Sequence, residues 1–156
     1  WAESGSPPNL TLNGEALALP SLLPQTDQTA SGVDPRRAQF IPIQRLWSPG
    51  DTLTLRLPMP IPARRAHPRL KGHAGKAALT RGPLVYCLES VDNPGVDIFS
   101  AQVDLPGLRA EFEPGLLGGV MTLRGQTPSG QPLTFIPYAL WGNRAESQMT
   151  VWVNTK

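Results

Sequence analysis

Short stretches in which apolar and polar residues alternate, separated by Gly and Pro turns, recur along the 156-residue chain. The clearest covers residues 52–59, where Leu53, Leu55, Leu57 and Met59 fall on one face and Thr and Arg on the other. A period of two over eight residues predicts a strand with one buried face and one solvated face.

The same alternation on both sides of Asn13-Gly14 predicts a β-hairpin over residues 9–19. Asn-Gly supplies the two positive-φ positions of a type I′ turn, which joins two antiparallel strands tightly. A second turn is expected at Ser48-Pro49-Gly50-Asp51, because proline suits the first central position of such a turn.

Further strands are expected wherever apolar residues run between turn signals, and no stretch shows the 3.6-residue period of a helix. These strands are 40–46 (an edge or bulged strand because of Pro42), 76–80, 84–88, 103–112, 120–123, 132–138 and 149–153, with a loop over 20–37. The pattern therefore predicts an all-β fold, an antiparallel, jelly-roll-like β-sandwich.

Composition narrows this picture further. With 18 Pro, 15 Gly and only 17% charged residues, the chain is not a coiled coil or a helical bundle. A hydrophobic share of 40% and a net charge of +2 argue against disorder, and no apolar stretch is long enough to span a membrane. Alternating prolines make residues 58–62 stiff and extended. We therefore expect a junction between two units, 1–62 and 63–156, or a single packed unit 1–156.

The pI of 9.0 is only weak evidence for nucleic-acid binding, because the net charge is only +2. The densest group of basic residues lies in one loop, which contains Arg64, Arg65, His67, Arg69, Lys71 and His73. This loop is either a phosphate-binding patch or a solvated loop, and the second interpretation is favoured because no aromatic stacking platform accompanies it. We expect neither nucleic acid nor a membrane as a partner.

Cys87 is the only cysteine, so the chain forms no internal disulfide and no cysteine-rich zinc site. Its position inside the apolar segment 84–88 predicts a buried small hydrophobe rather than a nucleophile. A lone thiol is compatible with a reducing cytoplasm. The first residues lack the features of a signal peptide, and a start at Trp1 suggests a processed chain or a piece of a longer one.

Two groups of residues are candidates for chemistry. Glu111 and Glu113 would share one face of a strand, as paired glycosidase carboxylates or, as we favour, as surface charge. No catalytic residue, cofactor site or metal site is therefore predicted. Aromatic and polar residues also gather near the end of the chain, either to contact carbohydrate or to fill the core; they are Tyr138, Trp141, Asn143, Arg144 and Trp152.

Three motifs carry a family resemblance. They are RGPLVYCLE at 81–89 followed by Asp92-Asn93, IPYALWGNR at 136–144, and MTVWV at 149–153. Two further motifs, LNGE at 12–15 and R-x-W-x-x-G-D at 45–51, precede them. In their order along the chain, these motifs resemble the C-terminal β-sandwich region of glycoside hydrolase family 127, the β-L-arabinofuranosidase-like enzymes. The resemblance implies that 1–62 is the C-terminal part of an incomplete first sandwich and that 63–156 is a second one. The resemblance is weakest over 20–37 and 103–127.

The resemblance implies a bacterial, retaining arabinofuranosidase-like parent whose chemistry lies in an (α/α)6 barrel outside this chain. That barrel would hold a cysteine nucleophile at a zinc site and a glutamate acid/base, and Cys87 matches none of these motifs. The implied partners are the barrel itself and an arabinose-containing glycan, with a homodimer as a further option. The alternatives are a free-standing carbohydrate-binding module that uses Tyr138, Trp141, Asn143 and Arg144, or a structural domain.

Overall fold

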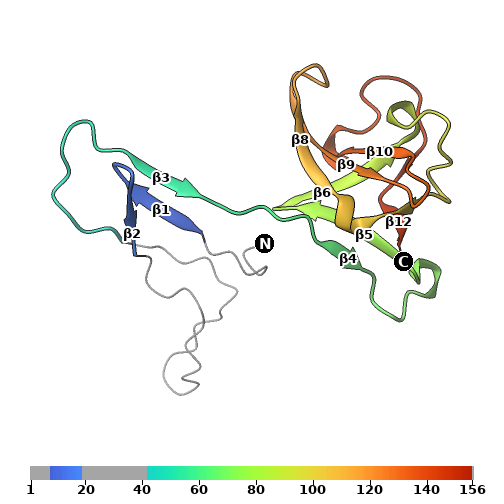
Figure 1. Cartoon of the computed structure of the whole chain (residues 1–156), viewed down its shortest axis with the longest axis horizontal. Coiled ribbons are helices and arrows are strands. Elements are labelled where there is room, and N and C mark those ends of the chain that lie inside the picture. Colours follow the sequence, from blue (N-terminus) through green and yellow to red (C-terminus); the bar gives the residue numbers. More distant parts are fainter. Residues whose placement is uncertain (1–7, 19–41, 156) are drawn as a thin grey trace. The chain divides into compact units, whose positions relative to one another are not determined.

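The computed structural model describes residues 8–18 and 42–155, and these residues fall into two compact units, Ala2–Pro58 and Met59–Lys156 (Figure 1). We call them the N-terminal and the C-terminal unit. The division follows Pro58, within the proline-rich segment 58–62. No helical turn among the described residues is long and apolar enough to cross a membrane.

The N-terminal unit contains a three-stranded antiparallel sheet in the order β2-β1-β3, built from β1 (Asn9–Leu12), β2 (Glu15–Leu17) and β3 (Leu53–Arg56). The predicted hairpin is confirmed, with Asn13 at φ 51° and Gly14 at φ 87°. The Ser48–Asp51 turn is also confirmed by a 3.1 Å hydrogen bond from Asp51 N to Ser48 O. The predicted loop 20–37 lies outside the described residues.

Two predictions for this unit are wrong. Residues 42–46 form no strand; Pro42 has no N–H to donate to a ladder, and Arg45 instead reaches the carboxylate of Asp51 at 3.3 Å. The leucine face of β3 is not buried, since Leu53, Leu55 and Leu57 are 42%, 55% and 42% exposed. The packing that buries Leu10 and Leu12 of β1 does not extend over the opposed leucines of β3, which lies at the edge of this sheet among the described residues.

The C-terminal unit is a curled sheet with the path β7-β12-β5-β6-β10-β9-β8, to which β4 adds beside β5 and β11 beside β6. The strands are β4 (Ala63–Arg65), β5 (Lys76–Arg81), β6 (Leu84–Glu89), β7 (Gln102–Val103), β8 (Arg109–Glu113), β9 (Val120–Gln126), β10 (Pro132–Pro137), β11 (Met149–Thr150) and β12 (Trp152–Thr155). Four 3-10 turns complete it: η1 (Lys71–His73), η2 (Ser90–Asp92), η3 (Leu105–Gly107) and η4 (Tyr138–Leu140).

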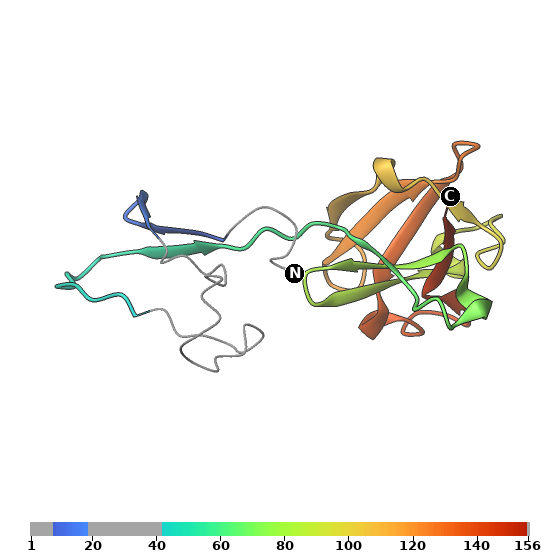
Figure 2. The ribbon, with the colours of Figure 1, turned by 90° about the horizontal axis from the view of Figure 1, so that it is seen from below.

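Strand β5 explains how this sheet closes on itself. Its first residues pair with β4 and β12, whereas Thr80 and Arg81 pair with β6. The strand therefore belongs to two layers, one around β12 and one around β6, β10 and β9. Figures 1 and 2 show β9 and β10 side by side in the second layer. The all-β, sandwich-like prediction is confirmed.

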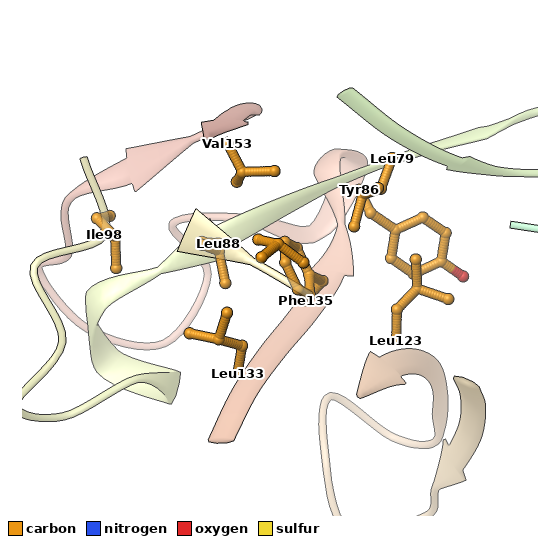
Figure 3. Close-up of a cluster of buried hydrophobic side chains, with 9 residues drawn as sticks. Leu79, Tyr86, Leu88, Ile98, Leu123, Leu133, Phe135 and Val153 are labelled. Carbon is orange, nitrogen blue, oxygen red and sulfur yellow. The ribbon is translucent and has the colours of Figure 1, made fainter. Parts of the chain in front are cut away.

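Side chains from both layers fill the space between them. Tyr86, Leu88, Leu123, Leu133 and Phe135 come from one layer, and Leu79, Val103 and Val153 come from the other, with Ile98 from a loop (Figure 3). Tyr86 keeps its hydroxyl satisfied by donating to Met121 O at 3.0 Å. Burying such a cluster supplies the main driving force for this unit.

One turn of the C-terminal unit favours glycine. Gly82 joins β5 to β6 at φ 55°, in the left-handed region that other residues adopt at a cost in energy. A Cβ there would lie 2.5 Å from Met59 Cε, the end of a flexible side chain that would have to move aside.

Two predicted strands are divided in the structure. Residues 103–112 form β7, η3 and β8, because Pro106 lies in the 3-10 turn between the strands. Residues 149–153 form β11, which pairs with β6, and β12, which pairs with β5 and β7. The chain changes layer at Val151, so the regular alternation from Met149 to Val153 does not correspond to one continuous strand.

Candidate functional site

The predicted carbohydrate-contact residues lie together where β10 ends. Tyr138 opens η4, and Trp141, Asn143 and Arg144 follow in the next turn. Tyr138 and Trp141 are 45% and 42% exposed as whole residues, so these two aromatics do not belong to the core. They stand on one short segment, which we call the 138–144 loop.

Arg144 attaches this loop to the sheet and does not face solvent freely. Its guanidinium is paired with Glu89 and makes two hydrogen bonds to Asp92. The hydrogen bonds with Asp92, followed by those with Glu89, raise the pKa of Arg144 well above its ordinary value against the opposing effect of burial. Charge-assisted, forked contacts of this kind fix geometry as well as energy.

Glu89 is the buried centre of this arrangement, with 1% of the residue exposed. One carboxylate oxygen accepts from Arg144, and the other accepts the backbone N–H of Gly142 at 2.8 Å. Asn143 adds a local bond, donating from its side-chain amide to Leu140 O at 3.1 Å. Of the four predicted residues, Tyr138 and Trp141 therefore face outward, while Arg144 holds the loop in place.

Sequence reasoning did not single out Glu89 and Asp92 as partners of Arg144. A usable signal was present, because two of the family-like motifs carry opposite charges: Glu89 and Asp92 at the end of the first, and Arg144 at the end of the second. Asn93, which follows η2, is bonded to β10: its side chain accepts from Thr134 N at 2.8 Å and donates to Thr134 O at 3.0 Å.

The paired carboxylates Glu111 and Glu113 lie on the edge strand β8, where each has an arginine partner. Glu111 is 3.6 Å from Arg109, and Glu113 is 2.8 Å from Arg124. Glu113, Arg124, Asp92 and Thr134 line a shallow polar hollow of about 350 Å³. Its charged groups already neutralise one another or Arg144, so the hollow leaves no free acid–base pair.

Cys87 is confirmed as a buried side chain on β6, with no exposed surface. Its thiol donates to Ile136 O at 3.7 Å. Burial, reinforced by the negative charges of Glu89 and Asp92, raises the pKa of this thiol to about 12. Thiolate is the nucleophilic form of cysteine, so Cys87 is not poised for attack at neutral pH.

The basic cluster lies on β4, on η1 and on the loop between them, and Arg64, Arg65, Arg69 and Lys71 are exposed. The described residues contain no group of three or more His, Cys, Asp or Glu side chains arranged to hold a metal ion. His67 and His73 thus have no carboxylate or thiolate companions for a metal site in this part of the chain.

Comparisons with known proteins agree on one family. A model of the glycoside hydrolase family 127 C-terminal domain matches residues 61–154. A non-reducing end β-L-arabinofuranosidase of Bifidobacterium longum is 35% identical over 130 residues, which covers 66% of this chain and 20% of the relative.

Solved structures give the same result for the fold. A GH127 β-L-arabinofuranosidase from Geobacillus stearothermophilus T6 is 34% identical with a TM-score of 0.68, over 97% of this chain and 25% of that one. A second structure, titled a glycoside hydrolase, has a TM-score of 0.72 at 24% identity, over 96% of this chain and 26% of that one. The chain thus spans about a fifth to a quarter of the length of these relatives.

Proposed function

The chain belongs to the glycoside hydrolase family 127 C-terminal domain family, and from this premise we propose that it is the non-catalytic β-sandwich portion of a longer glycoside hydrolase. The observation that carries the proposal is the family match over residues 61–154, combined with relatives of which this chain covers only 20% to 25%. Most of such a protein, including room for a separate catalytic domain, lies outside these residues.

The chemistry of the C-terminal unit supports a structural role. Its single thiol is buried and has a pKa of about 12. Glu89 and Asp92 are bound to Arg144, and Glu113 to Arg124. A general acid or nucleophile must reach the substrate in the correct protonation state, which these groups cannot do while they are held in ion pairs.

We propose that the catalytic groups and the zinc implied by the family resemblance reside in an (α/α)6 barrel elsewhere in the parent protein. The residues of this chain do not fit a zinc site, because the described portion brings no three suitable donors together. The exposed leucine face of β3 supports a related proposal: in the parent protein, further strands complete the sheet of the N-terminal unit.

An activity assay tests the proposal directly. The purified 156-residue chain should show no turnover of an aryl β-L-arabinofuranoside above the rate of a buffer blank. Cys87→Ala should give the same result. Turnover by the native chain that disappears in Cys87→Ala would overturn the proposal, since it would make this buried thiol catalytic.

The exposure of Tyr138 and Trp141 favours a second candidate function, carbohydrate binding by the 138–144 loop. Flat aromatic faces on a rigid loop suit stacking against sugar C–H groups, and Arg144 and Glu89 provide the rigidity. Calorimetric titration with arabino-oligosaccharides should show heat that Trp141→Ala removes. An absence of heat at millimolar sugar would reject this candidate and leave the supporting role unaffected.

A further inference from the structure

The layer formed by β4, β5 and β12 presents a face directed away from the core. Strand pairing places Arg64 opposite Ala78, and Ala78 opposite Trp152. Directly opposed residues of antiparallel strands share one face of a sheet, so these three residues form a row. Leu79 and Val153, which alternate with Ala78 and Trp152, are part of the core, and this puts the row on the opposite, outer side, where Ala78 itself is 8% exposed between its neighbours. Lys76, opposite Asn154, continues this outer face.

An aromatic ring is held in position on this face. Trp152 is half-buried, and His73 of η1 meets it edge-on, with ring centroids 4.8 Å apart and an interplanar angle of 68°. Neighbouring strands are spaced about 4.8 Å apart, so the Arg64 backbone lies about 10 Å from that of Trp152, across Ala78. We call this surface, made of Arg64, His73, Lys76, Ala78 and Trp152, the Trp152 face.

Positive charge accumulates on and beside the Trp152 face without matching negative charge. Arg64 and Lys76 lie on the face, and Arg69 and Lys71 lie in the segment that joins β4 to β5. Arg109, Arg124 and Arg144 all have carboxylate partners, whereas Arg64, Arg69, Lys71 and Lys76 take part in none of the ion pairs found among the described residues. Such an uncompensated patch attracts anions.

We propose that the Trp152 face binds an acidic glycan, one whose sugar rings carry carboxylates. A sugar ring would stack on the indole of Trp152, and its carboxylate would be bound by Arg64 and Lys76. This inference rests on the proposed function, because a domain of a glycoside hydrolase acts among glycans. Single-stranded nucleic acid is disfavoured, since its binding surfaces use several stacked aromatics, whereas this face has one large ring.

A binding experiment on the 156-residue chain tests the proposal, with a linear hexamer of galacturonate as the probe. We expect saturable shifts of the Ala78 amide and the Trp152 indole N–H in heteronuclear NMR spectra. Arg64→Ala should weaken the affinity by about fivefold or more, as expected for loss of a charge-assisted contact, and added salt should weaken it further. Because Arg64 is exposed, this variant is expected to fold.

Controls separate recognition of an acidic sugar from simple charge attraction. Arg109→Ala removes the same charge from an exposed site on β8 and should leave the affinity unchanged. The methyl-esterified hexamer lacks the free carboxylate, and polyglutamate lacks the sugar ring. Each should bind at least fivefold more weakly than the galacturonate hexamer. The proposal is overturned by absence of saturable shifts at millimolar hexamer, by equal losses in Arg64→Ala and Arg109→Ala, or by tighter binding of a single-stranded oligonucleotide. A negative binding result would leave the proposed non-catalytic role unaffected, because that role is tested by the separate activity assay.

Discussion

The two units of the chain begin from similar sequence patterns and reach different degrees of burial. In the C-terminal unit, strands such as β6 and β10 carry apolar residues that two layers enclose, and Leu88 and Phe135 are almost completely buried. In the N-terminal unit, β3 alternates more regularly than any other strand, yet its leucines remain exposed. An alternating pattern thus specifies which face a side chain occupies, but a second layer must exist before that face is buried.

The largest effect that this contrast predicts is in the core of the C-terminal unit. Phe135→Ala should destabilise this unit by about 4 kcal/mol, because truncating a buried aromatic leaves a cavity. Urea unfolding followed through the NMR signals of β6 amides measures the change. A loss below 1 kcal/mol would mean that the two layers do not pack as described.

The second largest effect on stability is expected where Arg144 attaches the 138–144 loop to the sheet. Arg144→Met removes the partner of a buried carboxylate, which is expected to cost about 3 kcal/mol because Glu89 is left uncompensated. The double variant Glu89→Gln with Arg144→Met should recover part of that loss. If the single variant is as stable as the native chain, Arg144 does not anchor the loop.

A smaller effect distinguishes two opposed leucines within the N-terminal unit. Leu10 and Leu55 are directly paired across β1 and β3, but Leu10 is buried and Leu55 is 55% exposed. Leu10→Ala should lower the free energy of unfolding of this unit by about 2 kcal/mol, and Leu55→Ala should lower it by less than about 0.5 kcal/mol. Amide exchange at Thr11 and Thr54 reports both, and equal losses would show that the leucine face is covered after all.

The smallest effect concerns pH in the same unit. The backbone N–H of Ser48, followed by the Asn13 side chain, lowers the pKa of Asp51 below 3.8, the value expected for an unfolded chain. A lowered pKa means that Asp51 stabilises the turn at pH values above 3.8 and that this contribution is lost as the pH falls through its folded-state value. An NMR titration of Ser48 N–H should therefore give a midpoint below 3.8, and Asp51→Asn should abolish that transition.

The sequence predicted those features that depend on local chemistry. Asn13-Gly14 specified its own turn, and the apolar surroundings of Cys87 indicated its burial. It did not predict features that depend on long-range partners. Whether Leu55 is covered depends on segments that do not neighbour it in sequence. The crossover at Val151 and the Glu89–Arg144 pair depend likewise on which strands meet β6 and β5.

Amide hydrogen exchange of the native 156-residue chain, resolved residue by residue, tests the central contrast most directly. The C-terminal unit has an enclosed core, whereas the β3 leucines of the N-terminal unit are exposed. This contrast predicts strong protection in β6, β9 and β10. It predicts exchange several orders of magnitude faster in β3, whose outer edge is unpaired among the described residues. Equal protection in β3 and β10 would contradict the account, because the N-terminal unit would then be a self-sufficient domain.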